Sequence, residues 1–212
     1  KKKKKWKDAA KAYEQAASLE KKAHNIVWLT PAKANNTWAM SVRGDLAREN
    51  GLNTLEDLAS YINGGGAFKF AASAEFVESA SALPAFQEAY GFKLGSDQLL
   101  ILSGGNTAAT LRAAALTDND VNGAMTYGTD GGLNALDLKV MEDTLGVQPV
   151  YQPAPIVRAE VLETYPNIRE VLAPVFESLD LETLQRLNGQ VAVNGVPAEA
   201  VARDYLDSLA QD

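Results

Sequence analysis

The chain has 212 residues, of which 46% are apolar and 22% charged, a composition that can bury a sizeable core and excludes a disordered chain. Its formal net charge is −7, so nucleic acid, which needs a basic surface, is not an expected partner. Cysteine is absent, which excludes disulfides, thiolate nucleophiles and cysteine metal sites. No apolar run is long enough to span a bilayer, and no signal-peptide core follows the lysines at positions 1 to 5.

Residues 1–37 are expected to contribute a tail, a helix and a strand. The basic run at residues 1–5 is typical of a solvated tail or an added tag. Small and apolar residues recur at helical spacing over 6–20, which predicts an amphipathic helix. The apolar run 26–29 predicts a buried strand that stops before Pro31, with Trp28 in the core.

The stretch 31–43 passes from a proline-marked turn into an extended segment. Alternation places Trp38, Met40 and Val42 on one face and Arg43 on the other, which predicts a half-buried strand.

Residues 38–148 are predicted to form one parallel-type α/β lobe, because strands alternate with helices along them. Thr54 and Asp57 predict a capping box, and Ser73 a further helix cap. The segment 98–102 predicts a buried strand. The other strands are expected at about 37–43, 68–72, 121–127 and 138–141, and the helices at 45–50, 54–62, after 73, from 83 to Gly91, 107–116 and 129–136.

Residues 149–212 are predicted to return to the first lobe. The segment 149–158 contains Pro153 and Pro155 and reads as extended, whereas the rest reads as helices at about 159–165, 167–178, 181–190 and 197–210. Two extended crossings, 31–43 and 149–158, therefore bracket the middle lobe, which is the geometry of a hinge.

No catalytic, cofactor or metal site is predicted, and an enzyme is not expected. The glycine-containing turns 103–107 and 127–131 could hold an anion, but an ordinary strand-to-helix turn is the favoured interpretation. Residues 118–123 match half of a calcium loop, yet Thr129 stands where the bidentate Glu is required, so an Asx-rich turn is the better interpretation. His24 has no partner at metal-ligand spacing, and no nucleophile elbow is present.

Three aromatic residues lie where a cleft between two lobes would open: Trp38, Tyr127 and Tyr151. Aromatic faces attract a quaternary ammonium, and Arg158 or a helix N-terminus would suit a carboxylate on the same solute. Arg43 is a poorer candidate, because alternation points it away from the Trp38 face. Packing in the core is the alternative role for each ring.

Five motifs resemble the osmoprotectant substrate-binding proteins of ABC importers, most closely the YehZ (OsmF) branch of that family. They are 28–38 (WLTPAKANNTW), 70–76 (FAASAEF), 83–94 (LPAFQEAYGFKL), 127–131 (YGTDG) and 151–158 (YQPAPIVR). The resemblance implies a type II periplasmic binding protein fold, with two α/β lobes joined by two crossing strands and the ligand in the cleft. It also implies a periplasmic location, an ABC permease in the inner membrane as partner, and a small zwitterionic or quaternary-amine solute such as glycine betaine. We expect a monomer.

The resemblance makes Trp38, Tyr127 and Tyr151 cleft aromatics, with polar neighbours at Asn36, Thr37, Thr129 and Arg158. Members of the family begin with a further first-lobe segment that carries a Gly-Ser-Lys and an Asp-Ile-Tyr-Pro-Glu-Tyr motif, so the first lobe is expected to be incomplete here. The alternative functions are a stress-related binding or interaction protein for a different solute, and a hydrolase, which would need a nucleophile and a base in contact.

Overall fold

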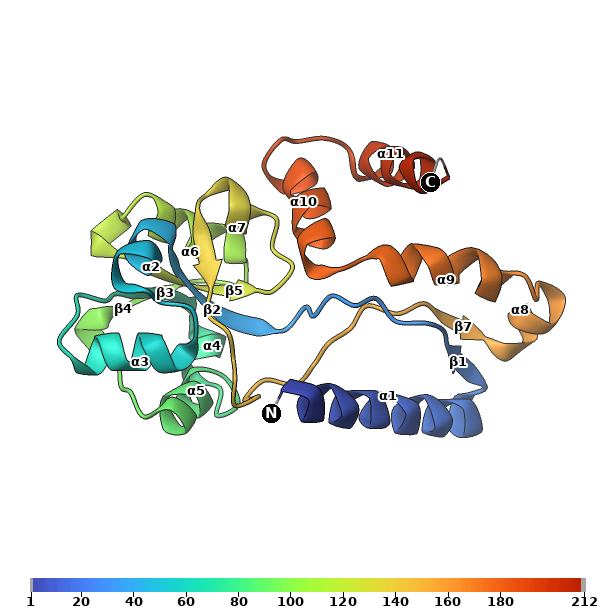
Figure 1. Ribbon diagram of the computed structural model, residues 1–212, viewed down its shortest axis with the longest axis horizontal. Coiled ribbons are helices and arrows are strands. Elements are labelled where there is room, and N and C mark those ends of the chain that lie inside the picture. The colour runs from blue at the N-terminus through green and yellow to red at the C-terminus, as the bar shows by residue number, and fades with distance from the viewer. Residues whose placement is uncertain (1, 211–212) are drawn as a thin grey trace.

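The computed structural model describes residues 2–210, and side chains from residue 11 to residue 210 (Figure 1). None of the helices in that part of the chain combines the length and the apolar character that crossing a bilayer requires. The elements are α1 (Lys2–His24), β1 (Ile26–Trp28), β2 (Trp38–Arg43), α2 (Gly44–Asn50), α3 (Leu55–Asn63), β3 (Phe70–Ser73), α4 (Ala74–Glu78), α5 (Leu83–Tyr90), η1 (Ser96–Gln98), β4 (Leu99–Leu102), α6 (Thr107–Ala115), η2 (Asp118–Asp120), β5 (Gly123–Tyr127), α7 (Gly132–Ala135), β6 (Leu138–Val140), β7 (Ile156–Arg158), α8 (Ala159–Thr164), α9 (Ile168–Ser178), α10 (Leu181–Ala192) and α11 (Ala198–Leu209).

A five-stranded sheet in the order β4-β3-β5-β2-β6 forms the centre of what we call the sheet unit, residues 38–141. β3 runs parallel to β4 and β5, whereas β2 runs antiparallel to β5 and β6. The prediction of a parallel-type lobe is therefore wrong for β2. Alternation of strands and helices along a sequence does not distinguish a strand that is inserted in the opposite direction.

Two predictions of burial are also wrong. Residues 39–42 are buried on both faces of β2, because helices α3 to α5 cover one side of the sheet and α6 and α7 the other. The predicted buried strand at 98–102 is instead the sheet edge, where the Ile101 side chain is 52% exposed. A continuous apolar run does not reveal whether a strand has neighbours on both sides.

The predicted helix caps are confirmed. Thr54 Oγ1 accepts the Asp57 N–H at 3.2 Å, and Asp57 Oδ2 accepts the Thr54 N–H at 2.9 Å, which completes a capping box at the start of α3. Hydrogen bonds from the backbone of Asn53 and Thr54 lower the pKa of the Asp57 carboxyl. Ser73 Oγ accepts the Phe76 N–H at 3.1 Å, and Gly91 ends α5 with φ +70°.

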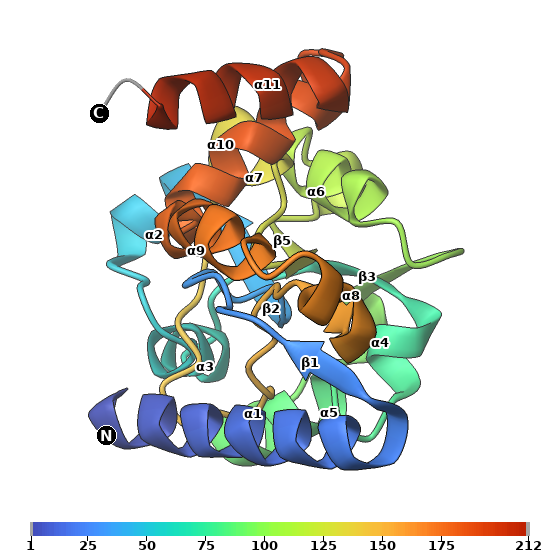
Figure 2. The same ribbon diagram turned by 90° about the vertical axis from the view of Figure 1, so that its right-hand side faces the viewer.

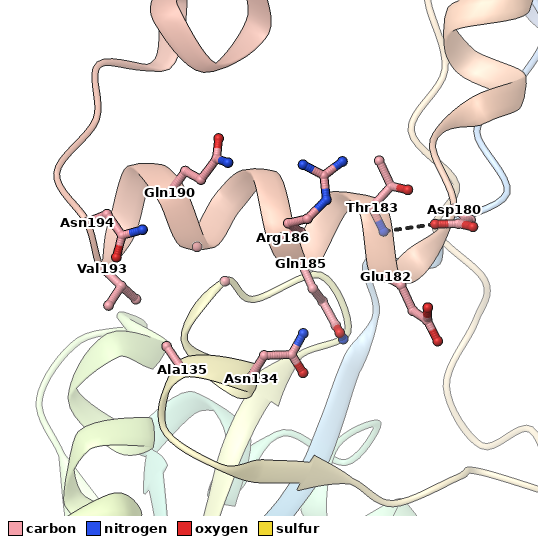
Figure 3. Close-up of a pocket in the computed structure, with 12 residues that line it drawn as sticks. Asn134, Ala135, Asp180, Glu182, Thr183, Gln185, Arg186, Gln190, Val193 and Asn194 are labelled. Atoms are coloured by element: carbon pink, nitrogen blue, oxygen red, sulfur yellow. Dashed lines mark hydrogen bonds between the residues drawn. The ribbon is translucent and has the colours of Figure 1, made fainter. Parts of the chain in front are cut away.

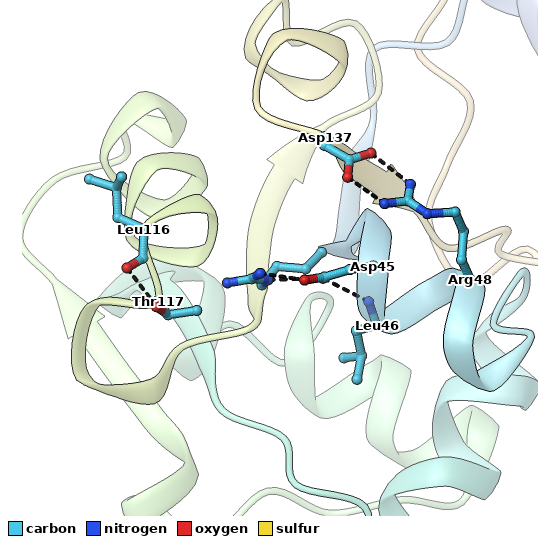
Figure 4. A network of polar contacts seen from close by, with 7 residues as sticks. Asp45, Leu46, Arg48, Leu116, Thr117 and Asp137 are labelled. Carbon is cyan, nitrogen blue, oxygen red and sulfur yellow. Dashed lines mark hydrogen bonds and ion pairs between the residues drawn. The ribbon is translucent and has the colours of Figure 1, made fainter.

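An ion pair forms near each end of α2 (Figure 4). Arg43 pairs with Asp45, which lowers the pKa of the Asp45 carboxyl to about 2, and Arg48 binds Asp137 with two hydrogen bonds of 2.9 and 2.7 Å. Arg43 thus lies at the far end of β2 from Trp38, engaged with a neighbouring carboxylate.

Two crossing segments connect the sheet unit with the rest of the chain: the first is 29–37 and the second is 149–155. β1 and β7 pair antiparallel with Ile26 opposite Arg158. Beyond that pair, the N–H groups of Leu29, Ala32 and Asn36 donate to the carbonyls of Pro155, Pro153 and Tyr151, at 2.9, 2.7 and 2.8 Å. The two expected crossings are thus paired by backbone hydrogen bonds.

The first helix and Trp28 differ from the predictions in extent and in burial. α1 extends further in both directions than 6–20, and Trp28 is half-buried with its ring edge-on to Tyr13, at a centroid separation of 5.3 Å. α9 contains Pro174 as predicted. α10 turns back from α9 and packs on α7 of the sheet unit (Figures 1 and 2).

Replacing Thr54 by alanine removes the side-chain acceptor of the capping box, so the free energy of unfolding should fall by about 1 kcal/mol. Urea denaturation measures it. Ser60→Ala, in the exposed part of the same helix, is the control and should leave the stability within about 0.5 kcal/mol. Equal stability of both variants would contradict the structural role given to the capping box.

Candidate functional site

A cavity of about 570 Å³ lies where the crossing segments enter the sheet unit. Its wall is mostly apolar and comes from the first crossing segment, β2, α3, α5, the turn after β6, the second crossing segment and α10. Residues that line it include Thr37, Trp38, Phe86, Glu142, Val150 and Leu181. We call it the Trp38 cavity. It has the size and the apolar character of small-molecule sites.

Trp38 and Tyr127 are brought together as the sequence led us to expect. They are register partners on β2 and β5, which puts both side chains on one face of the sheet. Their ring centroids are 6.4 Å apart with an interplanar angle of 32°, and the Phe76 and Trp38 rings meet edge to face with centroids 5.7 Å apart. Trp38 therefore packs on the core and lines the cavity at the same time.

Two buried polar atoms of residues that line the cavity lack a hydrogen-bond partner among the described residues. They are Thr37 Oγ1 and Trp38 Nε1, and both are buried. An unpaired buried polar group costs about 1–3 kcal/mol, so such atoms are uncommon in folded proteins. The two atoms belong to adjacent residues that line the cavity, and each is a donor without a partner among the described residues.

Three carboxylates line the same cavity: Glu56, Glu142 and Asp143. No Lys, Arg or His belongs to the described residues that line it. The negative potential of the three carboxylates favours a cationic group inside the cavity. The sequence analysis missed these carboxylates, although the spacing of Asp143 and Gly146 is a recognisable turn signal.

The Asp143 carboxylate organises the turn that links β6 to the second crossing segment. It accepts the N–H groups of Gly146, Val147 and Gln148, at 2.8, 3.1 and 3.0 Å, and the Tyr90 hydroxyl at 2.5 Å. Tyr90 accepts the Leu145 N–H in turn, at 2.9 Å. Burial, and next the hydrogen bond to Asp143, raise the pKa of Tyr90.

Tyr151 and Asn36 lie at a neighbouring cavity of about 780 Å³, between α1 and the two crossing segments. Tyr13 and Trp28 also line it, and the Tyr151 side chain is 59% exposed. Val150 belongs to the walls of both cavities. Trp38 therefore lines one cavity and Tyr151 the other, whereas Tyr127 packs beside Trp38 and is not among the described residues that line either cavity.

The remaining predicted site residues are Thr129 and Arg158. The Thr129 hydroxyl donates to Asn36 Oδ1 at 2.7 Å, which ties the loop after β5 to the first crossing segment. Arg158 lies at the end of β7, 73% exposed and paired with Glu160 at 3.2 Å. The structure does not bring Arg158 to the Trp38 cavity.

The loops considered for anion or metal binding fold as turns. Asp130 accepts the Tyr127 N–H at 2.8 Å and the Gly128 N–H bonds to Thr37, so 127–131 is a compact turn and the predicted helix from 129 starts later, at Gly132. Asn119 and Asp120 have left-handed backbone angles. Across residues 11–210, whose side chains the structure describes, no group of three His, Asp or Glu side chains is arranged to hold a metal ion.

A third cavity, of about 700 Å³, lies between α7 and α10 (Figure 3). Its wall mixes polar and apolar groups, and the polar side chains include Asn134, Gln185, Arg186 and Asn194. It is separate from the two cavities at the crossing, since the described residues that line it are shared with neither of them.

A sheet unit entered and left through paired crossings, with cavities at the crossing, is the arrangement of a type II periplasmic binding protein. Residues 4–208 match the family model described as the substrate binding domain of ABC-type glycine betaine transport systems, OpuAC. The chain belongs to this family.

Individual relatives support this family assignment. The chain is 55% identical to the glycine betaine-binding protein YehZ of Escherichia coli (strain K12), over 95% of this chain and 66% of YehZ. It is 31% identical to a glycine-betaine-binding protein of Pseudomonas aeruginosa, over 94% of this chain and 64% of that protein. The structure of apo YehZ from E. coli matches with a TM-score of 0.85 and 54% identity, over 96% of this chain and 73% of that one. The chain thus spans about two thirds of the length of these curated relatives.

The Tyr90 phenol should titrate late, because the folded protein favours its protonated form. The difference between the alkaline absorbance titrations of the parent chain and Tyr90→Phe isolates this group, and its midpoint should lie above the ordinary tyrosine value of about 10. A group whose pKa is raised by folding stabilises the fold fully below its unfolded pKa, and this contribution is lost as pH rises through the folded pKa. A midpoint at or below the ordinary value would contradict the Tyr90–Asp143 geometry.

Proposed function

We propose that this chain is the solute-binding component of an ABC importer, and that it binds a small quaternary-amine or zwitterionic solute of the glycine betaine type at the crossing segments. Family membership supports the class, and the relatives named glycine betaine-binding proteins support the ligand. The partner is an ABC permease in the inner membrane, and the location is the periplasm. The protein works as a monomer and catalyses no reaction.

The observation that carries this proposal is the pair of unpartnered donors that belong to two residues lining the Trp38 cavity. A zwitterion such as glycine betaine has a carboxylate that accepts hydrogen bonds from the Thr37 hydroxyl and the Trp38 indole N–H. Binding then supplies the hydrogen bonds that these two groups lack within the described protein. A neutral apolar solute would leave both groups unpaired.

The other end of the solute carries a positive charge and no N–H group. Such a group is held by aromatic faces and by negative potential rather than by hydrogen bonds. The Trp38 ring, packed beside Tyr127, supplies the face, and Glu56, Glu142 and Asp143 supply the potential. Tyr151 and Asn36 contact the same solute from the neighbouring cavity, and the hydrogen bond from the Thr129 hydroxyl fixes the position of the Asn36 side chain.

Thr37→Val tests the proposal, since it removes the hydroxyl and keeps the shape of the side chain. Calorimetric titration with glycine betaine should show a dissociation constant about tenfold higher, the loss of one hydrogen bond to a charged group. The thermal midpoint of the free protein should stay equal or rise, because the variant removes an unpaired buried hydroxyl.

Thr164→Val makes the same change on the exposed face of α8 and should leave the dissociation constant unchanged. Trp38→Phe provides a second arm, because it removes the indole N–H and keeps an aromatic ring. If glycine betaine, choline and carnitine all give no saturable heat with the parent chain, the proposed function is wrong. If binding occurs but Thr37→Val has the parent affinity, the solute lies outside the Trp38 cavity.

A further inference from the structure

α10 joins the sheet unit although the chain reaches it from α9, outside that unit. Its packing partner is α7, directly after the turn 127–131 (Figure 1). The junction between α9 and α10 is hydrogen-bonded to the first crossing segment, because the Leu179 carbonyl accepts the N–H groups of Lys33 and Ala34 at 3.1 and 3.2 Å. α10 therefore touches both the first crossing segment and the turn that carries Tyr127 and Thr129.

Two side chains of α10 hold the backbone of that turn. Gln185 Nε2 donates to the Gly128 carbonyl at 2.7 Å, and Asn188 Nδ2 donates to the Thr129 carbonyl at 2.9 Å. They lie three residues apart on the helix, so side chains on one face of α10 bind two successive carbonyls. Figure 3 shows Gln185 directed toward the turn, whereas Gln190 points away from it.

The backbones of α10 and the turn approach so closely that only glycine fits. A Cβ added to Gly131 would lie 2.2 Å from the Asn188 carbonyl carbon and 2.2 Å from the Gly189 nitrogen. Gly131 has φ −69°, an angle that any residue adopts, so space and not backbone conformation requires glycine here. This contact leaves little freedom for the turn to move relative to α10.

We propose that α10 positions the ligand-binding turn: Gln185 and Asn188 fix the Gly128 and Thr129 backbone, so that the Thr129 hydroxyl reaches Asn36 and Tyr127 stays beside Trp38. α10 moves as one body with the sheet unit. A change in the angle between the sheet unit and the rest of the chain then bends residues 178–180 and 193–197 as well as the two crossing segments. The part of this inference that concerns ligand affinity rests on the proposed function.

The variant Gln185→Glu with Asn188→Asp keeps the size of both side chains and replaces each N–H donor by an acceptor. Carboxylates that face carbonyl oxygens repel them, so the turn should detach from α10. Hydrogen exchange of the amides at 128–131 in the ligand-free protein should become about tenfold faster or more, while exchange in β3 and β5 stays unchanged. The dissociation constant for glycine betaine should rise by a similar factor.

Gln190→Glu is the matched control, with the same swap on the same helix but away from the turn. A second pair of variants tests the close contact: Gly131→Ala should lower the thermal midpoint, whereas Gly105→Ala, which meets no described atom within 4 Å, should not. Equal exchange at 128–131 in the double variant and in Gln190→Glu would overturn the positioning role. The exchange result is independent of ligand, so it decides the role of α10 even where no betaine binding is found.

Discussion

The hydrogen bonds between the two crossing segments are the constraint on which the rest of the structure depends. Pro153 and Pro155 have no N–H groups, yet the Pro153 carbonyl accepts from Ala32 and the Pro155 carbonyl from Leu29 of the opposite segment. The two segments can therefore run side by side although one is interrupted by prolines. Because the chain enters and leaves the sheet unit at one place, residues distant in sequence are gathered there.

Each feature of the candidate site follows from this convergence. The first crossing segment continues into β2, so Trp38 begins the strand beside the cavity and pairs with Tyr127 of β5. The turn organised by Asp143 leads into the second crossing segment and forms part of the cavity wall. α10 adds a third tie between the crossing and the sheet unit through Leu179, Gln185 and Asn188.

The sequence predicted the elements with strong local signals. The capping box at Thr54 and the glycine that ends α5 are each determined by a few neighbouring residues, and both are confirmed. The direction of β2 and the exposed edge at Ile101 were predicted wrongly, because they depend on which strands become neighbours. Trp38 and Tyr127 could be expected near each other, because both lie at strand ends where a cleft between two lobes would open. The carboxylates of the cavity and the contacts of α10 could not be expected, because they join segments without a local pattern.

A crystal structure of the chain with glycine betaine tests the central claim most directly. The account predicts the solute in the Trp38 cavity, with its carboxylate within hydrogen-bond distance of Thr37 Oγ1 and Trp38 Nε1 and its ammonium group against the aromatic rings and facing the carboxylates. Solute bound at a different place, with Thr37 and Trp38 still unpaired, would contradict it.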